Sequence, residues 1–301
     1  MAFNRKEIDA LGGLEQEHLE KLKIVHEVTE FEMPRYYALF LNQNGHTALK
    51  ERAVREALLH ATNRTGIIEE VFNGHGTPAF GPLHPQMKGY DASVYADDTF
   101  SLLAARMALE EAGWVVGSDG IRSKKTRDES VTLSFTVIVP DIPFLQSIVE
   151  YLARDWRAVG VELKPVLMDP EEIVRETIKT RNYEMILFGN ILRNNPDIFS
   201  FWHSSERFAP GLNLSLYDNQ KADTLLESIR RDFDETSAQA SIVELQTLLH
   251  EDIPAIFLFS PRYLYAHPKN VGGLTEQLIV APSDRFDNVA SWHLKTARIF
   301  R

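Results

Sequence analysis

The residues best suited to holding a small molecule follow the apolar run Tyr183–Phe188. From Gly189 to Tyr217, aromatic rings alternate with amide and hydroxyl side chains; this segment includes Asn190, Phe199, Phe201, Trp202, Ser204 and Asn213. Ligands of α/β proteins lie beyond the carboxyl ends of strands, in sites that combine apolar walls with a few polar groups. The segment is therefore a candidate ligand wall. The alternative is an ordinary core beneath a long loop, since aromatic residues are usually buried.

Motifs for covalent chemistry are missing from the sequence. It contains no G-x-S-x-G elbow, no H-E-x-x-H, no phosphate-binding loop and no dinucleotide fingerprint. Neighbouring carboxylates, such as Glu69 with Glu70 and Glu110 with Glu111, are typical of solvated helix faces. We therefore predict no catalytic residues and no enzyme.

Metal and cofactor sites are also not expected. The chain has no cysteine, which excludes thiolate metal sites and thiol catalysis. Only His75 and His84, in a loop rich in Gly and Pro, could approach a metal together, and their spacing is wider than the paired spacing of most structural sites. We interpret them as loop histidines.

Composition limits the partners. The 301 residues carry a formal net charge of −11, which opposes binding to nucleic acid and to anionic lipid surfaces. No apolar run approaches the ~20 residues that span a bilayer, and the first residues lack the pattern of a secretion signal. The length is that of about two domains.

Strand and helix patterns alternate along the chain. The segment 131–139 reads as a strand, Phe144–Val159 as a helix and Val161–Leu167 as another strand, a βαβ unit with a parallel pair. A helix over Phe100–Gly113 is expected to turn Leu103 and Met107 inward. Since no long linker separates these elements, the sequence predicts a two-lobed α/β protein.

Several segments resemble, in order, the family-5 extracellular solute-binding proteins, which are the oligopeptide, dipeptide and nickel-type receptors of ABC importers. The matching segments are Arg35–Asn44, Leu49–Leu83, Glu110–Trp114, Asp119–Lys125, Tyr183–Ser205, Gly211–Leu226, Glu251–Ala266 and Pro282–Trp292. Together they extend over nearly the whole chain. The resemblance implies a periplasmic-binding-protein fold of type II.

The resemblance also implies a domain division and a location. Residues 1–30 are similar to the end of lobe one, 31–270 to lobe two, and 271–301 to a return into lobe one. Because family members are longer, this chain is expected to be a C-terminal portion of one. The expected place is the periplasm or the outer face of the cell membrane, with the membrane reached only through the permease or a lipid anchor.

The function implied is that of a receptor without chemistry. Two lobes close around a peptide or another small solute and present it to the ABC permease. By position in the matching segment, the expected ligand-binding residues are the strand edge Phe188, Gly189, Asn190 and Ile191 and the side chains of Phe201, Trp202, Ser204, Asn213 and Tyr217. A metal chelate, a sugar, an interaction domain or an enzyme on the same scaffold are the alternatives.

One departure from the family bears on the ligand. Peptide receptors of this type commonly place an Asp four residues before the proline of this segment, where it pairs with the α-amino group of the peptide. Counting back from Pro196 gives Leu192. An ammonium buried without an anion would be costly, so the usual amino-terminal anchor is expected to be absent.

Overall fold

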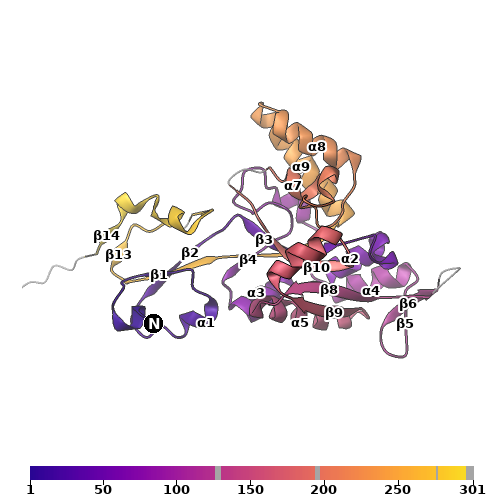
Figure 1. Ribbon diagram of the computed structural model, residues 1–301, viewed down its shortest axis with the longest axis horizontal. Helices are drawn as coiled ribbons and strands as arrows, with labels where there is room; N and C mark the ends of the chain where they lie inside the picture. The colour runs from indigo at the N-terminus through magenta and orange to yellow at the C-terminus, as the bar shows by residue number, and fades with distance from the viewer. Residues whose placement is uncertain (126–129, 194–196, 276, 296–301) are drawn as a thin grey trace, which may run out of the picture.

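The computed structural model describes residues 1–125, 130–193, 197–275 and 277–295. A large and a small body are joined by two stretches of chain (Figure 1). The first leads from β2 (Glu27–Phe31) to β3 (Arg35–Leu41), and the second leads from β11 (Ala255–Pro261) to β12 (Tyr263–His267). We call these two stretches the first and the second crossing. A hinge between the bodies would therefore bend at both of them.

The large body is built on a mixed sheet with the strand order β4-β11-β3-β10-β8-β9. Its other strands are β4 (Gly76–Pro78), β8 (Ser134–Pro140), β9 (Glu162–Met168) and β10 (Met185–Ile191). β3 runs antiparallel to both β10 and β11, whereas β8 runs parallel to β9 and β10. The parallel pair predicted on either side of helix α5 (Pro143–Arg157) is confirmed.

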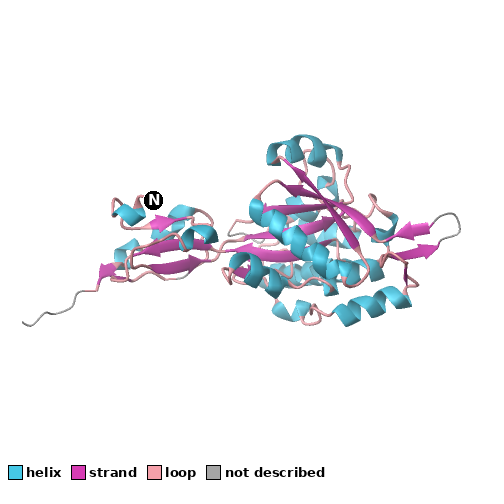
Figure 2. Ribbon diagram, turned by 90° about the horizontal axis from the view of Figure 1, so that it is seen from below, coloured by secondary structure: helices cyan, strands magenta, loops and turns pink. Residues whose placement is uncertain are grey.

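Helices cover both faces of this sheet (Figure 1, Figure 2). Leu39 and Leu41 of β3 pack into one cluster with α5, α2 (Arg52–His60), α3 (Arg64–Phe72) and α4 (Leu102–Glu111). Ala38 and Phe40 pack on the other side with α7 (Phe199–Trp202), α8 (Gln220–Arg231) and α9 (Glu235–Asp252). β3 is apolar at nearly every position because both of its faces are covered.

The small body has its own sheet, in which β12 lies between β1 (Leu11–Gly12) and β2. Its core consists of two clusters, one of Phe31, Met33, Tyr265 and Ile279 and one of Phe3, Leu22 and Ala266. Outside these two sheets, the other α-helices and strands of the described chain as a whole are α1 (Gln16–Leu19), the three-stranded sheet of β5 (Val115–Val116), β6 (Arg122–Lys125) and β7 (Ser130–Thr132), α6 (Pro170–Glu172) with a π-helical turn at Ile173–Ile178, and the pair β13 (Val271–Gly272) and β14 (His293–Leu294). Because β12 pairs with β2, the chain passes from one sheet to the other near Arg262. The division into lobes at residues 30 and 270 stays a prediction.

The predicted inward face of α4 is wrong. Leu103 is 67% exposed and Met107 is 50% exposed, whereas Ala105 and Leu109 are fully buried. Apolar spacing suggested the face with Leu103 and Met107, but the face of α4 that packs against α2 carries Ala105 and Leu109, which belong to the same core cluster as Ala57 of α2. Gly113, which follows the helix, has a left-handed conformation (φ 84°), as glycines at helix C-termini often do.

Candidate functional site: the open edge of strand β10

The carboxyl end of β10 lies where the large body meets the small one and carries an unpaired sheet edge. β10 pairs with β3 along its whole length, as far as Ile191 opposite Arg35. With β8 it pairs only at Met185 and Ile186. In the part of the chain that the structure describes, no strand pairs with β10 beyond Ile186 on that side. We call residues 187–191 the open edge.

Hydrogen bonds at both ends of β10 indicate which backbone groups this edge presents. The carbonyl of Glu184 accepts a bond from the β3 side at 2.9 Å, and the N–H of Leu192 donates one to that side at 2.7 Å. Residues of an antiparallel ladder alternate in the direction of their backbone groups. Even-numbered residues therefore bond to β3, and Gly189 and Ile191 direct their N–H and C=O toward the open side.

An aromatic platform lies on one face of the open edge. The ring of Tyr37 lies so close to Gly189 that a Cβ at position 189 would come within 2.9 Å of it. Tyr37 stacks on Phe259 with ring centroids 5.1 Å apart and meets Phe144 edge-on at 5.6 Å. Burial raises the pKa of Tyr37, which keeps its phenol neutral. The platform is thus apolar, and only glycine leaves it room at position 189.

On the other face, a buried hydrogen bond fixes the edge. The amide Nδ2 of Asn190 donates to the hydroxyl of Tyr36 at 2.8 Å, and both residues are buried. Burial raises the pKa of Tyr36, so this hydroxyl also stays neutral. Phe188 is half-buried beside the α8–α9 layer, whereas the side chain of Ile191 is 69% exposed. Backbone groups on a rigid strand are therefore what the site offers.

Trp202 and Asn213, predicted to face a ligand, take other roles. Trp202 is fully buried, with its ring 5.7 Å from that of Phe257 and 6.1 Å from that of Phe40. Asn213 is also fully buried; its Nδ2 donates to the carbonyl of Tyr217 at 2.9 Å and its Oδ1 accepts from the N–H of that residue at 3.1 Å. In this structure both side chains are buried and hold the long loop onto the core, and contact of either one with a ligand stays a prediction.

The other predicted side chains are also engaged within the protein. Ser204 donates through its N–H and Oγ to the carboxylate of Asp223, at 2.8 and 2.5 Å. The hydroxyl of Tyr217 donates to Asp252 at 2.5 Å, and burial together with this carboxylate raises the pKa of the phenol. Phe201 is half-buried against the α8–α9 cluster. Contact of these three with a ligand stays a prediction.

The two loop histidines belong to a polar network at the junction of the bodies. Nδ1 of His75 lies 2.8 Å from Glu30, and Nε2 of His84 lies 3.2 Å from Glu32. Arg262, on the second crossing, donates to both carboxylates at 2.8–3.0 Å. Both glutamates lie on or next to β2, on the first crossing. The network thus ties the two crossings to each other and to the large body.

The charge of Glu32 is stabilised within this network. Burial alone would raise the pKa of Glu32, but the hydrogen bonds from His84 and Thr77 and the charge of Arg262 together outweigh it and lower the pKa. The N–H of Gln86 donates to Nδ1 of His84, so Nε2 carries the proton that points at Glu32. Sequence reasoning missed this network because its members are adjacent only after both crossings have formed.

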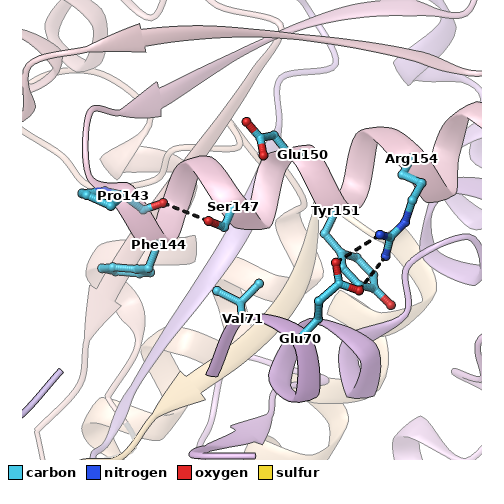
Figure 3. A pocket seen from close by; sticks show the side chains of 8 residues that line it. All are labelled: Glu70, Val71, Pro143, Phe144, Ser147, Glu150, Tyr151 and Arg154. Atoms are coloured by element: carbon cyan, nitrogen blue, oxygen red, sulfur yellow. Dashed lines mark hydrogen bonds and ion pairs between the residues drawn. The ribbon is translucent and has the colours of Figure 1, made fainter. Parts of the chain in front are cut away.

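A groove of about 380 Å³ lies between α3 and α5 (Figure 3). Arg154 holds Glu70 across its mouth through two hydrogen bonds of 3.1 and 3.0 Å. These charges neutralise each other, and the groove contains none of the predicted ligand-binding residues. A second pocket, of about 440 Å³, includes Tyr217 and Asp252, but it also contains Asn44, beyond the far end of β3. The open edge, which has unpaired backbone groups beside an aromatic platform, is a better candidate for the binding site than either pocket.

Among the residues that the structure describes, no cluster of three or more His, Asp or Glu side chains is arranged to hold a metal ion. No helix within the same ranges has the length and apolar character needed to cross a membrane.

Comparison with known proteins decides the family. Residues 1–209 match the bacterial extracellular solute-binding proteins, family 5. The chain belongs to this family. Its members are solute-binding proteins, and the family recognised in the sequence is confirmed.

Individual relatives support both the family and its fold. The oligopeptide-binding protein AppA of Bacillus subtilis is 25% identical over 278 residues, which is 91% of this chain and 49% of AppA. The probable D,D-dipeptide-binding periplasmic protein DdpA of Escherichia coli is 26% identical over 91% of this chain and 50% of its own length. The chain therefore spans about half the length of the relatives it matches.

The fold is similar to that of a solved oligopeptide-binding protein. The structure of Bacillus subtilis AppA in complex with a nonapeptide superposes with a TM-score of 0.78 at 22% identity and covers 97% of this chain and 57% of that one. The α/β periplasmic-binding-protein fold expected from the sequence is confirmed.

Proposed function

We propose that this chain belongs to the receptor of an ABC importer and holds an extended peptide against the open edge of β10. The observation that carries the proposal is the pair of outward-facing backbone units at Gly189 and Ile191, on a strand with no partner beyond Ile186 on that side within the described ranges. A sheet edge recognises an extended chain through its backbone, and therefore with little dependence on its side chains.

Peptides suit this edge better than the alternatives. A strand edge offers alternating N–H and C=O groups, which match a peptide backbone and not a sugar or a metal chelate. The names of relatives agree, since AppA is described as oligopeptide-binding and DdpA as probably D,D-dipeptide-binding. The aromatic platform under Gly189 then provides an apolar floor for a ligand side chain.

The junction provides the moving part of the proposed mechanism. Residues 1–30 and those after the second crossing belong to the lobe that closes over the edge, and the network of Glu30, Glu32 and Arg262 lies at the pivot. The closed form is recognised by the permease, at the periplasmic or outer face of the cell membrane. No covalent step is required of any residue.

Substituting Ile191 tests the proposal. Ile191→Pro removes an N–H that points away from β3, so the β3 ladder stays intact, but a bound strand loses one hydrogen bond and meets the proline ring. We expect peptide affinity to fall about 10-fold or more. The matched control Ile191→Ala keeps the N–H and should stay within about threefold, the effect of losing exposed side-chain contact.

Isothermal titration of the protein at its natural length, with short synthetic peptides, separates the outcomes. Unequal affinities of the two variants support strand addition at the edge. Equal affinities, with both variants folded by circular dichroism, would show that the ligand does not pair with β10.

A further inference from the structure

Each crossing is short and has a proline in it or beside it. The first consists of Glu32, Met33 and Pro34, between β2 and β3, and the second is Arg262, which follows Pro261. A proline ring fixes the φ angle of its own residue and restricts the residue before it. Only a few backbone angles can therefore bend when the two bodies move against each other.

Glu32 is bonded to both bodies at once. Its backbone carbonyl accepts a hydrogen bond of 2.9 Å from the N–H of Ile279, a core residue of the small body. Its carboxylate faces the large body, where the hydroxyl of Thr77 on β4 donates to it at 2.9 Å and Nε2 of His84 donates to it at 3.2 Å. A change in the angle between the bodies would therefore strain these bonds.

Arg262 connects the two crossings through its side chain. Its Nε donates to Glu32 at 2.8 Å, its Nη1 donates to Glu30 of β2 at 3.0 Å and its Nη2 donates to the hydroxyl of Thr77 at 3.2 Å. One rigid guanidinium makes all three contacts, so it cannot turn toward one partner without leaving another. The three charged side chains are between 15% and 30% exposed, and water and salt therefore screen their attraction less than on an open surface.

The first crossing is also fastened to the end of the open edge. The carbonyl of Pro34 accepts a hydrogen bond of 2.7 Å from the N–H of Leu192, the residue that follows Ile191. β3 begins directly after Pro34 and pairs with β10 along the whole open edge. The position of the first crossing is therefore linked to the strand that is proposed to hold the ligand.

Resting on the proposed function, we infer that Arg262 is a positioning residue that makes the two crossings bend as a single hinge. Two crossings that flexed independently would let the bodies twist as well as close. Because Arg262 holds both carboxylates at the first crossing from its place on the second, the crossings move together and the small body approaches the open edge in one orientation. This coupling raises the fraction of molecules that can close over a ligand, and the apparent affinity rises with that fraction.

Distances between two spin labels test this inference without a ligand. The 301 residues contain no cysteine, so labels are attached to cysteines introduced at the exposed Lys23 of the small body and Lys179 of the large body. The protein is used at its natural length, with any cysteine outside these residues replaced. Arg262→Gln should widen the distance distribution at least about twofold, because it leaves Glu30 and Glu32 without their shared cation. Arg262→Lys keeps the charge but not the planar fork, so its distribution should be intermediate in width.

Peptide titration of the same variants connects the hinge to binding. The apparent peptide affinity should fall about 3- to 10-fold in Arg262→Gln, because fewer molecules can close over the ligand. The control Arg154→Gln removes the same charge from an exposed ion pair within the large body. Its distance distribution and its affinity should both match those of the unsubstituted protein.

The two measurements give separate answers. A distribution in Arg262→Gln as narrow as that in Arg154→Gln would overturn the inference, and so would a wider one that leaves the peptide affinity unchanged. Should Arg262→Gln not fold by circular dichroism, the wider distribution expected of Arg262→Lys decides the question in its place. If no peptide binds to the unsubstituted protein, the proposed function fails, while the label distances still decide whether Arg262 couples the crossings.

Discussion

Replacing Trp202 with alanine should lower the free energy of unfolding by about 3–5 kcal/mol, the usual cost of removing a large buried aromatic ring. The ring is fully buried between the sheet and the α8–α9 layer, beside Phe40 and Phe257. Its loss leaves a cavity that neighbouring side chains fill only in part. Urea denaturation followed by circular dichroism measures the difference.

Phe208 is the matched control for this substitution, because it lies in the same segment and is 64% exposed. Phe208→Ala should change the free energy of unfolding by no more than about 0.5 kcal/mol. A Trp202→Ala variant with unchanged stability but lost peptide binding would contradict the structure, and would return Trp202 to the ligand wall predicted from the sequence.

Replacing Asp98 with asparagine should destabilise the protein by about 3–5 kcal/mol, because it leaves a buried cation without its counter-ion. Asp98 receives two hydrogen bonds from Arg64, at 2.8 and 2.9 Å, and both side chains are almost completely buried. Arg64, the first residue of α3, also donates to the carbonyl of Phe257 at 2.7 Å. The pair therefore anchors α3 to the sheet beneath the aromatic platform.

A double substitution and an exposed pair complete this test. Arg64→Met combined with Asp98→Asn should be less destabilising than the sum of the two single changes, because no buried charge is left unpaired. Glu70→Gln breaks the exposed pair with Arg154 and should cost less than about 1 kcal/mol. Equal effects of Asp98→Asn and Glu70→Gln in thermal denaturation would show that the Arg64–Asp98 pair is not buried in solution.

Local pattern was sufficient to predict most of the large body. Helix α5 shows apolar residues at helical spacing, and β10 is an apolar run that is covered on both faces, so each has a signal within its own residues. Which strands pair with one another, in contrast, has no such local signal. The short strand β12 looks like β11 in sequence but belongs to the other sheet, because the chain crosses between bodies at Arg262 and then pairs with β2.

Only part of the proposed site has a signal in the sequence, for the same reason. The strand ending at Ile191 was identified from its apolar run and its place in the family, but Tyr37 joins it only through the antiparallel register of β3 with β10. Composition indicated a ligand wall at Trp202 and Asn213, yet rings and amides serve equally well to fasten a loop to a core. Residue type alone does not separate these uses.

Residue-resolved amide hydrogen exchange, with and without a bound peptide, tests the open edge most directly. Without ligand, the amides of Phe188 and Asn190 should be protected by β3, while those of Gly189 and Ile191 exchange rapidly. With saturating peptide, Gly189 and Ile191 should become protected and the even-numbered amides should change little. Binding that leaves the exchange of Gly189 and Ile191 unaltered would contradict the account.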